Sequence, residues 1–160
     1  MICYFVRHGL AADAAQWRGS DFDRPLTEQG IARTAAVAKR FAKVVTADVG
    51  AIVTSPLLRA KQTAEIVALA LDLRDRLVED ARLGGGFDVD GLSEILQRHA
   101  GAEAIVLVGH EPDMSATVGH AIGGARLEFK KAAIACVDFR DPPSAYGELL
   151  WMAPPKVLLG

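Results

Sequence analysis

The stretch Ile2-Cys3-Tyr4-Phe5-Val6-Arg7-His8-Gly9 decides the fold class. Its apolar first part predicts a β-strand over residues 2–6, and this strand ends in a cation, an imidazole and a glycine. In open α/β sheets, ligands bind at the carboxyl ends of the strands. We therefore expect an α/β protein that presents the side chains of Arg7 and His8 at a ligand-binding edge.

The same arrangement recurs twice further along the chain. The predicted strand at residues 50–54 runs into Ser55-Pro56-Leu57-Leu58-Arg59, and the predicted strand at residues 104–108 runs into Gly109-His110-Glu111-Pro112. Three strand ends thus supply two arginines and two histidines. These are residue types that bind and transfer phosphoryl groups.

The remaining segments complete an alternation of strands and helices. Apolar periodicity predicts further elements, which are helices at residues 27–46, 56–71, 88–100 and 112–122 and a short strand at residues 77–80. Two last strands, at residues 134–139 and 148–152, are joined by a turn-rich segment. This pattern predicts a three-layer α/β/α sandwich in one domain over residues 1–160, with a mostly parallel central sheet and an antiparallel C-terminal edge.

Local signals refine the helices and one loop. Ser55-Pro56 predicts the start of the second helix, with the serine as its cap and the proline at its first position. The first helix is predicted to bury one face, made of Ile31, Ala35, Ala38 and Ala42. Residues 10–25 form a long connection beside a strand end, as functional lids do.

Composition and charge bound the partners of the protein. The chain has 160 residues, of which 51% are hydrophobic and 24% charged, as in globular proteins. The formal net charge of −2 argues against nucleic acid and anionic membranes as partners, since both favour basic surfaces. We expect no membrane span, because no apolar run approaches ~18 residues. The sequence carries no signal for an oligomeric state.

The two cysteines, Cys3 and Cys136, lie in apolar strand-like runs, which predicts buried free thiols. No Cys or His cluster has metal-ligand spacing, so we expect neither a metal nor another cofactor. Only six residues precede Arg7, too few for the apolar core of a signal peptide. We therefore expect a cytoplasmic location.

The residues at the strand ends suit covalent phosphoryl transfer. Arg7 and Arg59 could clamp the phosphoryl oxygens through their planar, permanently charged forks. A neutral His8 could attack phosphorus and form a covalent phosphohistidine. The carbonyl of Gly9 could hold the other ring nitrogen, and the nearby arginines should keep His8 unprotonated. His110 would donate hydrogen bonds to the transferring oxygens, and no metal would be required.

These motifs resemble those of the histidine phosphatase superfamily, which has the phosphoglycerate-mutase-like fold. Arg7-His8-Gly9 is similar to the motif that gives the family its name, and Gly109-His110 to its second histidine. The segment at residues 55–64 resembles the helix of its second arginine, and residues 24–30 resemble the segment before its first helix. The resemblance implies that His8 is the nucleophile.

The resemblance also implies a phosphate pocket and a subfamily. The pocket would comprise Arg7, Arg59 and His110, with Gly9 also contacting the substrate, and would need no metal. The short chain, the Gly109-His110-Glu111-Pro112 form and the closing segment at residues 149–154 are similar to SixA-type phosphohistidine phosphatases.

The general acid is where the chain departs from the family. Larger members carry a carboxylate proton donor on an insertion that this chain almost lacks, and Glu79 and Asp80 are the nearest candidates. An ordinary charged segment explains these two residues equally well. A phosphohistidine needs less acid help than an alkyl phosphate, because imidazole is the better leaving group.

We therefore expect a phosphatase that acts on phosphohistidine carried by a phosphotransfer protein. Two alternatives remain open from the sequence. One is a small-molecule phosphomonoesterase of the same superfamily, and the other is a non-catalytic phosphate-binding or signalling module.

Overall fold

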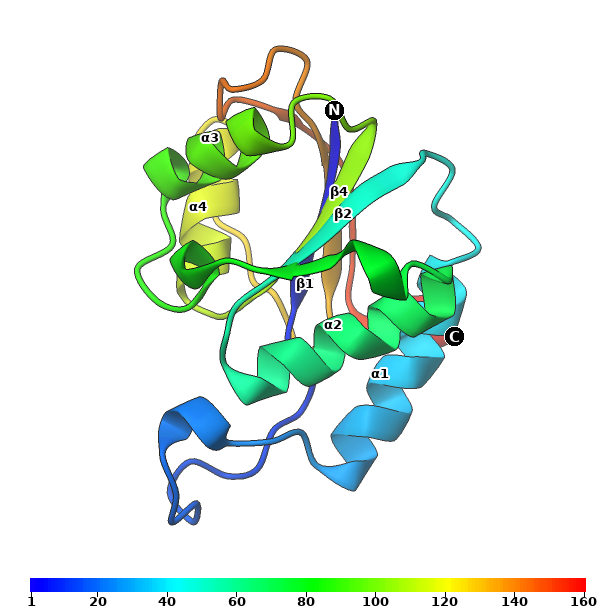
Figure 1. Cartoon of the computed structure of the whole chain (residues 1–160), viewed down its shortest axis with the longest axis vertical. Coiled ribbons are helices and arrows are strands. Elements are labelled where there is room, and N and C mark those ends of the chain that lie inside the picture. Colours follow the sequence, from blue (N-terminus) through cyan, green and yellow to red (C-terminus); the bar gives the residue numbers. More distant parts are fainter.

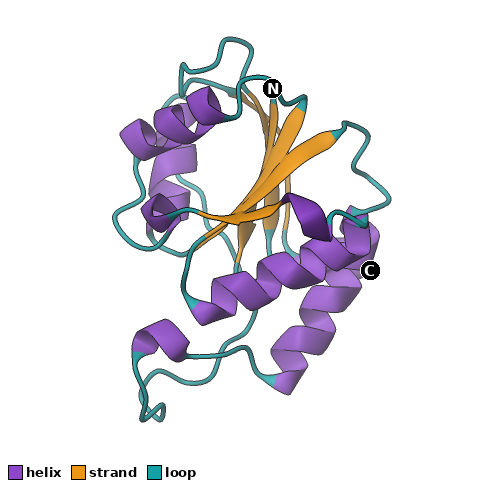
Figure 2. Ribbon diagram, viewed as in Figure 1, coloured by secondary structure: helices purple, strands orange, loops and turns teal.

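A six-stranded sheet forms the centre of the computed structural model, which describes residues 1–160 (Figures 1 and 2). The strands are β1 (Ile2–Arg7), β2 (Val49–Thr54), β3 (Leu77–Glu79), β4 (Ala104–Gly109), β5 (Ile134–Asp138) and β6 (Glu148–Ala153). The helices are α1 (Glu28–Phe41), α2 (Leu58–Leu71), α3 (Val89–Arg98), α4 (Asp113–Ala121) and α5 (Pro155–Leu159). Three short 3-10 turns join them, namely η1 (Asp21–Asp23), η2 (Arg74–Arg76) and η3 (Ala81–Leu83).

The sheet has the order β3-β2-β4-β1-β5-β6 and confirms the predicted mostly parallel sheet with an antiparallel C-terminal edge. Strands β1, β2, β3 and β4 pair in parallel, whereas β5 pairs antiparallel with both β1 and β6. The three strands that precede the candidate residues are neighbours, with β4 between β2 and β1. Their carboxyl ends therefore meet at one edge of the sheet.

Helices cover both faces of the sheet, with α3 and α4 on one side and α1, α2 and α5 on the other (Figure 1). Successive residues of a strand point to opposite faces, so Phe5 packs in the α3–α4 core and Val6 in the α1–α2 core. Burial of each large apolar side chain contributes ~1.5–3 kcal/mol to folding. Both cysteines are buried free thiols, as expected.

Three details differ from the sequence-based prediction. Helix α1 ends at Phe41 and buries Val37, Ala38 and Phe41, while Ile31 is 42% exposed. The buried stripe therefore lies beside the predicted one, because the larger side chains at positions 37 and 41 face the sheet. Helix α5 has no counterpart in the prediction.

Helix α2 is the third case, because it begins at Leu58 with Leu57 as its cap, and not at Ser55-Pro56. The hydroxyl of Ser55 is 2.7 Å from Nε2 of His110. Ser55 thus belongs to the site and does not cap the helix. The helix therefore begins at Leu58, two residues later than predicted.

The connection between β1 and α1 extends beyond the sheet edge at which β1 ends (Figure 2). It contains η1 and is pinned at its base by a bridge between Ala11 and Leu26. No helix in the structure has the length and apolar character needed to span a bilayer.

Candidate active site

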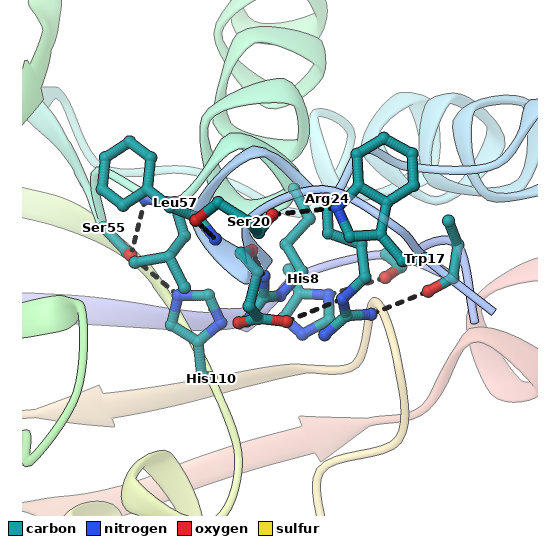
Figure 3. A network of polar contacts seen from close by, with 12 residues as sticks. His8, Trp17, Ser20, Arg24, Ser55, Leu57 and His110 are labelled. Carbon is teal, nitrogen blue, oxygen red and sulfur yellow. Dashed lines mark hydrogen bonds and ion pairs between the residues drawn. The ribbon is translucent and has the colours of Figure 1, made fainter. Parts of the chain in front are cut away.

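Backbone pairing brings the predicted residues together at the carboxyl ends of β1, β4 and β2. Beyond the strand ends, the N–H of His8 donates to the carbonyl of Gly109 at 3.0 Å, and that of Ser55 donates to Val108 at 3.0 Å. The rings of His8 and His110 lie 5.1 Å apart, centroid to centroid. His8, Arg59 and His110 are all buried, and Figure 3 shows His8 and His110 within a network of polar contacts.

The imidazole of His8 is held in one orientation by its neighbour. Its Nδ1 lies 2.7 Å from the carbonyl oxygen of Gly9. A carbonyl can only accept, so Nδ1 carries the proton and Nε2 keeps its lone pair. This is the holding contact expected from the sequence, and it leaves Nε2 as the nucleophilic nitrogen.

Electrostatics keep His8 neutral. Burial is the main cause that lowers its pKa to about 3, and the positive charges of Arg59 and Arg7 act in the same direction, as does His110. The hydrogen bond to the Gly9 carbonyl opposes this shift only in part. A neutral ring has the free electron pair that attack on phosphorus requires.

We predict that His8 stays unprotonated throughout the neutral range. Because its pKa is lowered, its ring resonances in NMR spectra should not shift between pH 8 and pH 5, and protonation should begin only below that range. The His8→Ala variant would assign the signals. A titration midpoint near the ordinary histidine value of about 6.5 would contradict this account.

The guanidinium of Arg7 is anchored from outside the site. Its Nη1 donates to the carbonyl of Phe129 at 2.6 Å, while Nε is buried without a partner. The N–H of Ala132 donates to the carbonyls of Arg7 and His8, and Ala132 has a left-handed backbone with φ of 62°. The segment before β5 thus braces Arg7 and His8 and leaves donor capacity on Arg7 for a ligand.

Arg59, the second residue of α2, already holds an anion. Its Nη2 donates to Oδ2 of Asp21 at 3.0 Å, and its Nη1 donates to the Asp21 carbonyl at 2.8 Å. Arg24 also binds the Asp21 carboxylate, through Nε at 2.8 Å. Hydrogen bonds from Arg24 and Arg59 lower the pKa of Asp21, although burial opposes them. The exposed Asp21 carboxylate on this fork shows that the Arg59 guanidinium is oriented to bind an anion.

Sequence reasoning missed Asp21 and Arg24 as members of the site. The long loop at residues 10–25 was a signal that could have found them, since it follows the strand end that carries His8. Nothing in the spacing of its charged residues distinguishes Asp21 from Asp23.

Gly9 has two roles within the protein itself. Its N–H donates to Oγ1 of Thr63 at 3.0 Å, so this donor is already used. A β-carbon at position 9 would lie 2.3 Å from Oγ1 of Thr34, which explains why glycine stands there. Gly9 therefore orients His8 and packs tightly against the helices.

The two candidate acids, Glu79 and Asp80, lie at the end of the edge strand β3 and are both ion-paired. Glu79 pairs with Lys61 at 2.6 Å, and Asp80 pairs with Arg82 and Arg98 at 3.0 and 2.8 Å. Burial alone would raise the pKa of Asp80, but the N–H and guanidinium of Arg82, with Arg98, lower it overall. Asp80, stabilised as an anion, is therefore a weak proton donor.

His110 completes the group from β4, just before α4. Burial is the main cause that lowers its pKa to about 4, and Arg59 adds to the effect. The site therefore combines a neutral nucleophile, a second neutral imidazole and two guanidinium groups. No group of three or more His, Cys, Asp or Glu side chains is placed to hold a metal ion.

Comparison with known proteins identifies a family and relatives of the chain. Residues 3–84 match the histidine phosphatase superfamily (branch 1). An uncharacterized protein of Picosynechococcus sp. is 40% identical over 139 residues, which cover 84% of this chain and 82% of that protein.

Two solved structures are similar to this chain over nearly its whole length. The structure of the protein histidine phosphatase SixA complexed with tungstate has a TM-score of 0.85 and 29% identity, covering 98% of each chain. The alpha-ribazole phosphatase from Shigella flexneri shares the fold, with a TM-score of 0.74 and 15% identity over 97% of each chain.

Proposed function

The chain belongs to the histidine phosphatase superfamily, and on that premise we propose that it dephosphorylates phosphohistidine on a phosphotransfer protein. The protein is a phosphatase. The observation that supports its mechanism is the hydrogen bond between Nδ1 of His8 and the Gly9 carbonyl, which leaves Nε2 of His8 free. The similarity to the protein histidine phosphatase SixA supports this substrate class.

The reaction follows from the geometry in two steps. First, Nε2 of His8 attacks phosphorus, the P–N bond of the substrate breaks, and the leaving imidazole takes the electron pair and then a proton from water. Water next attacks the phosphoryl group on His8, the new P–N bond breaks with its electron pair returning to Nε2, and phosphate leaves. A proton lost by the attacking water converts the hydroxide left by the first step back to water. Arg7, Arg59 and His110 stabilise the charge on the transferring oxygens in both steps.

The choice of substrate class rests on whether the protein has an acid that can protonate the leaving group. Glu79 is ion-paired with Lys61, and Asp80 is stabilised as an anion by Arg82 and Arg98, so the chain presents no free carboxylic acid at these two positions. An alkoxide leaving group needs that proton much more than imidazole does. A small-molecule phosphomonoesterase remains the second candidate, because a fold neighbour is an alpha-ribazole phosphatase.

We predict that a phosphohistidine protein is hydrolysed much faster than sugar phosphates, with aryl phosphates between them. The measurement is kcat/KM for the three substrate types. Glu79→Gln and Asp80→Asn should scarcely change the phosphohistidine reaction, but would slow the alkyl phosphate reaction if either residue is its proton donor. Sugar phosphates as the best substrates would replace this proposal with the phosphomonoesterase.

We also predict that activity survives exhaustive chelation with EDTA. The two guanidinium groups, with a hydrogen bond from His110, can offset the charge of the transferring phosphoryl group without a metal ion. Initial rates before chelation, after it, and after re-addition of Mg²⁺ or Zn²⁺ should agree. Strict dependence on either ion would contradict the mechanism.

A further inference from the structure

His110 has one ring nitrogen with a partner and one without. Its Nε2 lies 2.7 Å from Oγ of Ser55, whereas Nδ1 is buried and has no hydrogen-bond partner. Ser55 and His8 lie on opposite sides of the His110 ring in Figure 3. A buried donor without a partner costs about 1–3 kcal/mol, so Nδ1 is a place where a bound ligand would supply the missing acceptor.

The hydrogen bonds of Ser55 determine which nitrogen of His110 carries the proton. The Ser55 side chain is completely buried, and its Oγ accepts the N–H of Leu57 at 3.2 Å. The other hydrogen-bond partner of Oγ is Nε2 of His110. No other acceptor lies within hydrogen-bond distance of Oγ, and a buried hydroxyl proton without an acceptor would cost about 1–3 kcal/mol. This cost favours a hydroxyl that donates to the lone pair of Nε2, with the proton of the neutral ring on Nδ1.

The backbone around Ser55 keeps the hydroxyl in place. The N–H of Ser55 donates to the carbonyl of Val108 at 3.0 Å, which ties the end of β2 to the end of β4. The hydroxyl of Thr54 donates to the Ser55 carbonyl at 3.1 Å. Ser55 is thus fixed to the strand that carries His110.

We propose that Ser55 is a positioning residue that holds His110 in the Nδ1–H tautomer, so that His110 donates this proton to an oxygen of the phosphoryl group in transfer. The role in transfer rests on the proposed function, whereas the tautomer does not. Burial, aided by Arg59, lowers the pKa of His110 to about 4. The ring is therefore neutral at pH 7 and has a single N–H, which can serve a phosphoryl oxygen only if it is on Nδ1, the nitrogen without a protein partner.

The tautomer can be measured without any turnover. Long-range ¹H–¹⁵N correlation spectra of the wild-type protein at pH 7 should show Nδ1 of His110 protonated and Nε2 unprotonated. In Ser55→Ala, the signals should move toward the Nε2–H form. A protonated Nε2 in the wild type, or an unchanged tautomer in Ser55→Ala, would overturn the proposal. If Ser55→Ala does not fold, the wild-type spectrum decides alone.

Kinetics test whether Ser55 acts through His110. Ser55→Ala should lower kcat/KM for the phosphohistidine protein about tenfold, mainly through kcat. The same change in a His110→Ala background should cause no further loss. Ser55→Thr, which keeps the hydroxyl, should recover most of the activity.

The matched control is Thr117→Val, which removes another buried hydroxyl, bonded to the carbonyl of Phe87. It should leave kcat/KM near the wild-type value. Equal losses from Ser55→Ala with and without His110 would show a structural role and overturn the proposal. If the wild type hydrolyses no phosphohistidine, the proposed function fails, while the NMR result still tests the tautomer.

Discussion

His8→Ala should abolish turnover while leaving the fold intact. The imidazole supplies the attacking nitrogen, and no neighbouring side chain in the site offers another free nucleophile of that kind. Loss of a nucleophile typically costs more than about 10⁴-fold in kcat. The fold should survive, because the change removes a polar side chain at a strand end and none of the large apolar residues of either core. The measurement is kcat with the phosphohistidine protein.

The control for this prediction is structural. Circular dichroism and thermal unfolding of His8→Ala should match the wild type within a few degrees. A folded His8→Ala protein that keeps its activity would disprove the covalent mechanism.

Arg59→Lys should lower turnover by about a hundredfold, the effect expected when one donor to a transition-state oxyanion is lost. Lysine keeps the charge but loses the planar fork, which here makes two contacts to Asp21 and would make two to a phosphoryl group. Steady-state kinetics should place the loss mainly in kcat, because the charge on the equatorial oxygens is greatest in the transition state.

Arg76→Lys is a matched control, since Arg76 lies in η2 and bonds Asp48 and the Val49 carbonyl at the opposite end of β2. It should have nearly normal kinetics. Nearly normal kinetics for Arg59→Lys as well would remove Arg59 from the pocket.

The parts that the sequence predicted share one physical cause. Apolar runs that end in Arg7, His8 or His110 identify a buried parallel sheet, and all parallel strands place their carboxyl ends at the same edge. The strand ends were therefore enough to predict that Arg7, His8 and His110 lie at one edge, whereas Arg59 was predicted from its place in the helix that follows β2. The Gly9 carbonyl was also predicted as the partner of the His8 ring, because Gly9 is the next residue in the chain.

The parts that were missed depend on contacts between distant segments. Ser55 followed by proline has the local pattern of a helix cap, yet its hydroxyl faces His110, a residue 55 positions away. Asp21 lies in a loop without periodicity, and only the folded chain brings it to Arg59. The predicted buried face of α1 was also wrong. Alanines lie on several sides of this helix, so their positions do not identify the side that packs against the sheet.

The covalent phosphohistidine on His8 is the central claim, and trapping it tests the claim most directly. The protein would be mixed with a ³²P-labelled phosphohistidine protein and quenched in alkaline denaturant within one turnover, and the label located by mass spectrometry. We predict label on His8, stable to alkali and lost in acid, and none in His8→Ala. Release of phosphate without any labelled protein, or label on a different residue, would contradict the mechanism.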